Sequence, residues 1–153
     1  MKTLASIALA TFIGLPLAAA AEPTRLASYP DDALEQIDFL TRCAGLSRAL
    51  QRGGIDREHY VPHVGADFNA KLSEFERALR PLVMTYFGFD PNDLKIMDEG
   101  RNQLPHVRIV SYGVEETIKA KQGFYETMSQ FREKPEWDAI VIEDLATCGE
   151  API

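Results

Sequence analysis

Three residues of types that commonly bind divalent metals stand at four-residue intervals, at His59, His63 and Asp67. On an uninterrupted helix this interval places side chains along one face, where two imidazoles and a carboxylate could hold zinc or copper. However, Pro62 lies between the two histidines, and Gly65 lies between His63 and Asp67. Because proline lacks the N–H that a helix needs and collides with the preceding turn, we expect no metal site here. A metal-binding protein is therefore our second hypothesis.

The same stretch fits a simpler arrangement of a turn followed by a helix. We expect a short turn after Asp56, with Asp67 capping or opening the regular helix that follows. His106 could complete a metal site only if the fold brings it close to the other two histidines, which the sequence does not determine.

Sequence motifs for catalysis are missing. There is no G-x-S-x-G, P-loop, G-x-G-x-x-G or H-E-x-x-H pattern. Neighbouring acidic residues such as Glu143 and Asp144 point in different directions on a helix, so we interpret them as solvated side chains rather than a catalytic pair. An enzyme, our third hypothesis, would need a constellation such as His106 with Ser111 or Tyr112. We accordingly predict no catalytic residues and no cofactor.

The N-terminus, MKTLASIALATFIGLPLAAAAEP, has the organisation of a secretory signal peptide. A positive charge precedes an apolar run over residues 4–17, and Ala19 and Ala21 satisfy the small-residue rule for cleavage. We predict that residues 1–21 are removed before Glu22 and that the protein is periplasmic or secreted from a bacterium. The apolar run is short for a membrane span, so we expect no membrane insertion after cleavage.

Residues 22–153 comprise 132 residues, enough for one domain with a sizeable core. They carry 15 basic and 23 acidic residues, a net charge of −8. Nucleic acid and anionic lipid would repel such a chain, so we exclude both as main partners. A partner protein or a small ligand remains.

Two cysteines, Cys43 and Cys148, lie in this mature segment. In an oxidising compartment an even pair is most simply one disulfide. A redox pair would normally be a C-x-x-C motif and a covalent haem site C-x-x-C-H, and the sequence contains neither. We predict a structural bond between Cys43 and Cys148.

Apolar residues recur with a helical period through most of the mature chain, whereas residues 22–29 are expected to form a loose leader. In the first helix, Ala44 and Gly45 allow a neighbouring helix to approach closely. The expected helices run from Asp31 or Asp32 to Gly53–Gly54, from Phe68 to Tyr86 with Pro81 inside, from Asp90 to about Gly100, from about His106 to Arg132, and from Pro135 to Cys148. We predict an all-α, single-domain bundle of four main helices plus a short helix, with the first and last helices joined by the disulfide.

This layout resembles small secreted helical proteins of Gram-negative bacteria. Those proteins carry one cysteine in the first mature helix, here within FLTRCAGLSRAL, and another near the end, here within LATCGE. The resemblance implies an exported helical protein with a single disulfide, and it implies no activity and no catalytic residue. Our first hypothesis is therefore a non-catalytic binding protein of the periplasm, acting through protein–protein interaction.

Overall fold

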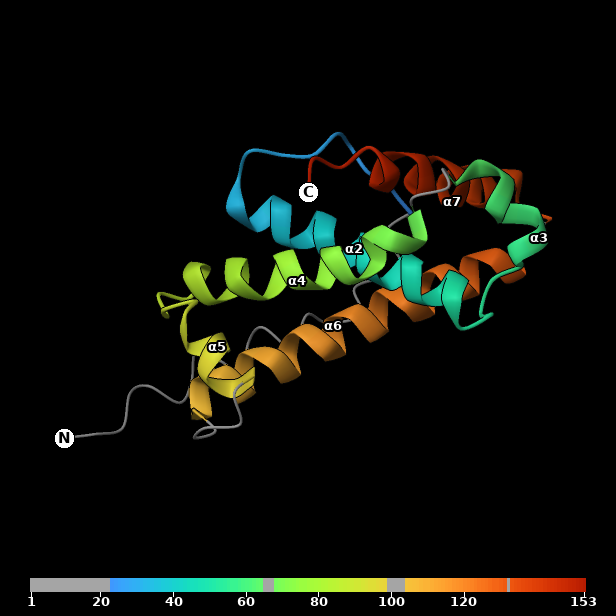
Figure 1. The fold of residues 1–153 in the computed structure, drawn as a ribbon. Coiled ribbons are helices and arrows are strands. Elements are labelled where there is room, and N and C mark those ends of the chain that lie inside the picture. The colour runs from blue at the N-terminus through green and yellow to red at the C-terminus, as the bar shows by residue number, and fades with distance from the viewer. Residues whose placement is uncertain (1–22, 65–67, 99–103, 132) are drawn as a thin grey trace.

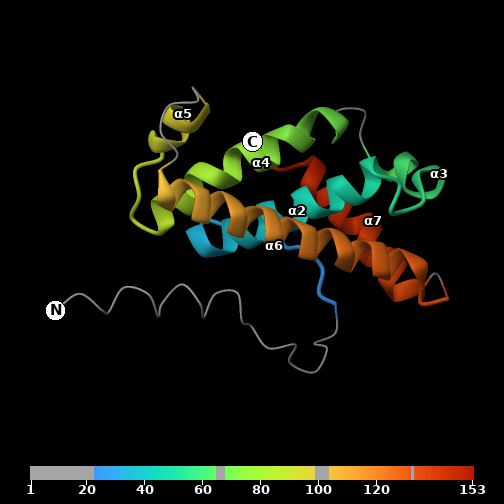
Figure 2. The same cartoon turned by 90° about the horizontal axis from the view of Figure 1, so that it is seen from below.

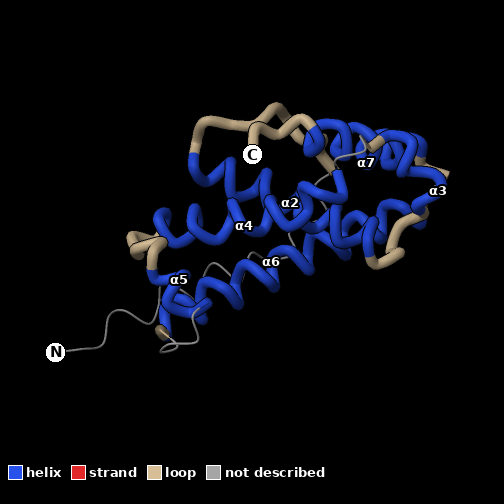
Figure 3. Tube along the Cα trace, viewed as in Figure 1, coloured by secondary structure: helices blue, strands red, loops and turns tan. Residues whose placement is uncertain are grey.

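Helices account for most of the chain that the computed structural model describes, which comprises residues 23–64, 68–98, 104–131 and 133–153. The elements are α2 (Ala33–Gln51), α3 (Arg57–Tyr60), the 3-10 helix η1 (Val61–His63), α4 (Phe68–Tyr86), α5 (Asp93–Asp98), α6 (Pro105–Gln130) and α7 (Pro135–Gly149). No strand occurs within the described ranges (Figure 3). The prediction of an all-α bundle is confirmed.

The first long helix, α2, is the centre of the bundle. Figures 1 and 2 show it enclosed by α4, α6 and α7. All residues from Phe39 to Leu50 are buried, including the polar side chains of Thr41, Arg42, Ser47 and Arg48. The sequence indicated one apolar face on this helix. The structure instead buries every face, because other helices cover the polar positions too.

Capping residues, prolines and glycines mark most helix boundaries close to the positions predicted from the sequence. The Asp32 carboxylate accepts hydrogen bonds from the N–H groups of Leu34 and Glu35, as an N-cap does. Pro135 stands in the first turn of α7, where its missing N–H costs nothing. Beyond the end of α2, Gly53 has φ 75°, a conformation that glycine adopts without strain.

Three details differ from the sequence-based expectation. The short helix was expected to begin at Asp90, but Asp90 lies in a turn, where its carboxylate accepts from the N–H of Asn92, and α5 begins only at Asp93. The long helix was expected to reach Arg132, but α6 ends at Gln130, and Phe131 beyond its end is exposed. Leu34 and Tyr86 belong to the apolar helical period of the expected helices, but both are exposed because they lie at helix ends.

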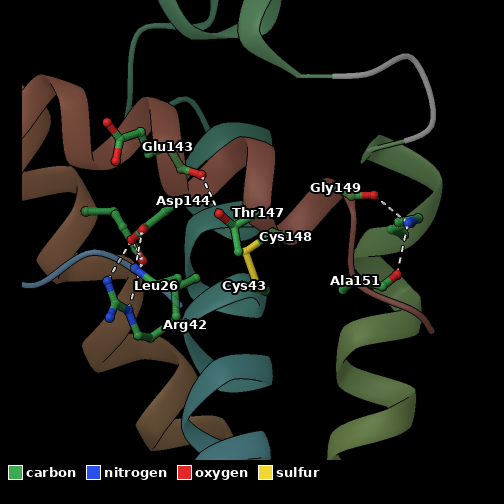
Figure 4. Close-up of a disulfide and its surroundings, with 11 residues drawn as sticks. Leu26, Arg42, Cys43, Glu143, Asp144, Thr147, Cys148, Gly149 and Ala151 are labelled. Carbon is green, nitrogen blue, oxygen red and sulfur yellow. Dashed lines mark hydrogen bonds and ion pairs between the residues drawn. A yellow bond between two sulfur atoms is a disulfide. The ribbon is translucent and has the colours of Figure 1, made fainter. Parts of the chain in front are cut away.

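A disulfide joins Cys43 on α2 to Cys148 on α7 (Figure 4). Both cysteines are fully buried. The bond therefore connects the central helix to the last helix, as the sequence predicted, and pins α7 across the bundle.

Gly45 lets α2 and α6 pack closely. A Cβ atom at this position would lie 2.7 Å from the backbone nitrogen of Gln122 on α6. Gly45→Ala should therefore reduce the free energy of unfolding by about 1–3 kcal/mol, the usual effect of overpacking. Urea denaturation measures this change.

Gly123→Ala on α6 is the matched control, because nothing lies within 4 Å of a Cβ placed there. This substitution should be neutral or stabilising by up to about 1 kcal/mol, the difference in helix propensity. Equal effects of the two substitutions would contradict the close packing at Gly45.

Candidate functional site

The most deeply buried charges of the described chain form a cluster beside the disulfide (Figure 4). Arg42 Nη2 on α2 lies 2.6 Å from Asp144 Oδ2 on α7, and the two side chains are 9% and 0% exposed. The Tyr125 hydroxyl on α6 donates to the same Asp144 oxygen at 2.6 Å. Arg42 Nε donates to the Tyr125 oxygen at 3.2 Å. Three helices thus contribute one side chain each to a polar cluster inside the bundle.

Two main-chain groups of the N-terminal segment complete this cluster. The N–H of Leu26 donates to Asp144 Oδ1 at 2.7 Å, and Arg42 Nη2 donates to the carbonyl of Thr24 at 2.7 Å. Residues 22–29 were expected to be a loose leader. The described residues 23–29 are indeed non-helical, but Leu26 and Tyr29 pack against the core.

The interpretation of Asp144 as a solvated side chain is wrong. It lies four residues after Ile140 and four before Cys148, and all three are buried on one stripe of α7. Arg42 likewise lies four residues before buried Leu46 on α2. Charged residues in core register were the sequence signal for a buried ion pair, because an unpaired charge is not tolerated there.

The Tyr125 hydroxyl should make the protein sensitive to alkali. Burial, and next the charge of Asp144, raise the pKa of Tyr125 above its ordinary value of 10.0. The unfolded chain then loses this proton at lower pH than the folded one, so the stabilisation is complete below about pH 10 and is lost as pH rises. At pH 11 the loss should be about 1.4 kcal/mol.

Urea denaturation at pH 8 and pH 11 tests this expectation, with Tyr125→Phe as the control. The wild type should lose about 1.4 kcal/mol more than the variant between the two pH values. An equal loss in both proteins would show that Tyr125 does not titrate in the unfolding equilibrium.

A second ion cluster ties the central helix to two others. Arg48 on α2 donates from Nε to Glu76 on α4 at 2.6 Å, and from both Nη atoms to the two Glu115 oxygens on α6 at 2.7 Å. The Arg48 hydrogen bonds lower the pKa of Glu115. The arrangement is a two-pronged arginine–carboxylate pair, whose described partners are all protein groups.

The candidate metal ligands are not stacked on one helix. His59 lies in α3 and His63 in η1, with ring centroids 6.3 Å apart. His59 Nε2 contacts Asp138 Oδ1 at 2.9 Å, and the Tyr60 hydroxyl donates to the same oxygen at 2.7 Å. Asp67 lies outside the described residues. Within the described part of the chain, no group of three or more His, Cys, Asp or Glu side chains is placed to hold a metal.

His106 is paired with Asp93 on α5, a residue that the sequence analysis did not connect with it. Its Nε2 lies 2.7 Å from Asp93 Oδ2 on α5, and its ring lies against that of Phe89, with centroids 4.9 Å apart. The ring therefore connects the start of α6 to α5 and to the turn before it. Its described hydrogen bond goes to Asp93, not to Ser111 or Tyr112.

Zinc or copper, added after chelation, should leave the melting temperature unchanged. A genuine site would raise the free energy of unfolding by about 2.7 kcal/mol at a hundredfold excess of metal over Kd, whereas here His59 is already engaged with Asp138. Thermal melts of the wild type and of a His59→Ala, His63→Ala variant test this. A shift seen in the wild type and absent from the variant would establish the metal-binding hypothesis.

Exposed large hydrophobic side chains gather where α4 ends and α6 begins. Five of the eight such side chains in the described ranges lie there, and we call this set the aromatic end: Tyr86, Phe87, Phe89, Ile109 and Tyr112. Tyr112 is 64% exposed and Ile109 is 50% exposed. Figures 1 and 2 both place the end of α4, α5 and the start of α6 together at one end of the bundle.

A shallow depression beside α4, lined by Glu74, Arg77, Ala78 and Ile153, opens to solvent. None of the described helices is both long and apolar enough to span a bilayer.

Comparison with known proteins yields no relative. No protein-family model matches the chain, and neither the curated proteins nor the solved structures contain a match.

Proposed function

We propose that the chain is an exported, non-catalytic interaction protein of the bacterial periplasm, and that it binds a partner protein through the aromatic end. The observation that carries this proposal is the concentration of exposed apolar side chains at that end. Exposed apolar side chains concentrated in one region commonly mark protein interaction sites, and aromatic residues contribute strongly to binding energy.

The polar clusters support binding rather than catalysis. The carboxylate of Asp144 is fully buried and hydrogen-bonded, and the guanidinium of Arg48 is bonded to two glutamates. Charged side chains held by partners in this way are not poised to act as an acid, a base or a nucleophile. Export is supported by the sequence of residues 1–21 and by the Cys43–Cys148 bond, which fits an oxidising compartment.

Export is tested by sequencing the N-terminus of protein recovered from a bacterial periplasm. We expect the chain to begin at Glu22, after the small residues Ala19 and Ala21. Recovery of a chain that retains Met1 in the membrane fraction would contradict cleavage.

Binding is tested by cross-linking the exported protein in cells, identifying the partner, and titrating the two purified proteins. An Ile109→Ser, Tyr112→Ser variant should bind the partner at least about tenfold more weakly, as expected for two aromatic-end contacts. Val61→Ser is the matched control, because Val61 is 41% exposed but lies in η1. Equal binding by both variants would reject the aromatic end as the interface.

A further inference from the structure

The extended N-terminal segment is held by buried charges that contact its main chain. We call residues 23–29 the strap. Arg42 donates to the Thr24 carbonyl and Asp144 accepts from the Leu26 N–H, both at 2.7 Å. The two charged side chains are 9% and 0% exposed. These are contacts to backbone groups, which nearly every residue type can offer.

The strap runs alongside α2 in the opposite direction (Figure 1). Thr24 contacts Arg42, Tyr29 packs edge-to-face on Phe39 with centroids 5.2 Å apart, and Pro30 accepts from Gln36. In an extended chain, the carbonyl of residue i and the N–H of residue i+2 point to the same edge. Thr24 and Leu26 stand in this relation. Arg42 and Asp144 therefore offer the donor and acceptor that a neighbouring β-strand would offer to that edge.

One oxygen of the buried carboxylate depends on the strap. Asp144 Oδ2 receives hydrogen bonds from Arg42 and Tyr125, whereas the described donor to Oδ1 is the Leu26 N–H. With the strap in place, the Leu26 N–H satisfies an acceptor of a side chain that is fully buried. Arg42 and Asp144, which we call the cradle, thus favour the presence of an extended chain beside them.

The strap itself is attached by few contacts. Thr24, Arg25, Ala27 and Ser28 are exposed. Arg25 pairs with Glu143, and these two side chains are 58% and 46% exposed, so their attraction is screened by solvent. The buried core cluster and the Cys43–Cys148 bond consist of residues outside the strap, and Leu26 and Tyr29 of the strap pack against that core as partly buried side chains. Terminal segments of this kind open without global unfolding.

We propose that the cradle is a binding site for an extended peptide of another protein, which the strap occupies in its absence. Main-chain hydrogen bonds provide the binding, as in recognition by strand addition. The strap defines the side chains that fit: a basic residue opposite Glu143, an apolar residue next, and an aromatic residue three positions further on, as in Arg25, Leu26 and Tyr29. This site lies on α2 and α7 and is distinct from the aromatic end.

Hydrogen exchange on the unmodified chain from residue 22 onward tests whether the strap opens. The Leu26 amide should exchange at least about a hundredfold faster than the Leu46 amide in the middle of α2, because only local opening is needed. Equal protection of the two amides would mean that the strap leaves only on global unfolding, and would overturn the proposal.

Peptide binding is tested by fluorescence anisotropy with a labelled peptide of residues 22–30, EPTRLASYP, which contains the strap. In the wild type, the attached strap competes at an effective concentration of about millimolar. Leu26→Pro removes the N–H that donates to Asp144 and so weakens the competing strap. This variant should therefore bind the peptide at least about tenfold more tightly than the wild type. Tyr29→Ala, which weakens the strap through a side chain alone, should also bind it more tightly.

The control peptide carries N-methyl-leucine at the position of Leu26, which keeps the side chain and removes the N–H. Its binding should be at least about tenfold weaker, the effect of one hydrogen bond to a charged acceptor. Equal binding of the two peptides, or no binding to either variant, would show that the cradle only anchors its own strap. A wild-type dimer that Leu26→Pro converts to monomer would replace the proposal by exchange of straps between two copies.

Discussion

Replacing both cysteines by alanine is expected to lower the free energy of unfolding by about 2–5 kcal/mol. Cys43 and Cys148 are separated by 105 residues, and closing so long a loop restricts the unfolded chain by up to about 4.7 kcal/mol in the chain-entropy description. Because both side chains are fully buried, the alanines also remove packed sulfur atoms from the core. Urea denaturation of the oxidised wild type and of the double variant measures the difference.

The control is the wild-type protein unfolded and refolded under reducing conditions. It keeps the sulfur atoms but not the bond, so its stability should lie between those of the oxidised protein and the alanine variant. If reduction changes the free energy of unfolding by less than about 1 kcal/mol, the bond does not stabilise the fold to the extent usual for a disulfide.

The helices were predictable because their signals are local. Asp32, Pro105 and Pro135 stand at helix starts, and Gly53 and Gly88 follow helix ends with positive φ. The disulfide was predictable because only one pairing exists for two cysteines. The apolar run AIVI lies within the helix expected from Pro135 to Cys148, and it is part of α7.

Burial on the other faces of α2 could not be inferred from the period alone. Thr41, Ser47 and Arg48 occupy positions that a helix on the outside of a bundle would expose. They are buried because α4, α6 and α7 cover α2 from several sides. Which helix is central depends on how the helices pack against one another, and this information is not in any single segment.

The partner of His59 likewise depends on the fold and could not be predicted from the sequence. The spacing of His59 and His63 is compatible with a metal site on a helix. Pro62 predicted that the two histidines do not share a regular helix, and this is confirmed. The partner that the fold supplies to His59 is Asp138, 79 residues away. Nothing near His59 in the sequence points to that aspartate.

The two ion clusters connect α2 to different parts of the bundle. Arg48 connects it to α4 and α6 through glutamates that are 24% and 32% exposed. Arg42 connects it to α6 and α7 through side chains with little or no exposure, and to the strap through the carbonyl of exposed Thr24. Because desolvated charges depend far more on their partners than solvated ones do, the Arg42 cluster should dominate the effect of substitutions.

Asp144→Ala is accordingly expected to lower the free energy of unfolding by about 3–5 kcal/mol, the usual effect of leaving a buried charge without its partner. The substitution removes the acceptor for Arg42, the Tyr125 hydroxyl and the Leu26 N–H at once. Glu143→Ala is the matched control one residue earlier. Its side chain is 46% exposed and pairs with exposed Arg25, so its loss should change stability by less than about 1 kcal/mol.

An Arg42→Met, Asp144→Leu double variant separates the two contributions to that loss. If the damage in Asp144→Ala comes from the uncompensated guanidinium, removing both charges should be less destabilising than removing the carboxylate alone, as for other buried ion pairs. Urea denaturation of the single and double variants under one set of conditions gives the comparison. Additive losses, or an Asp144→Ala protein as stable as Glu143→Ala, would show that the pair is not a coupled buried charge and would remove the physical basis of the cradle as well.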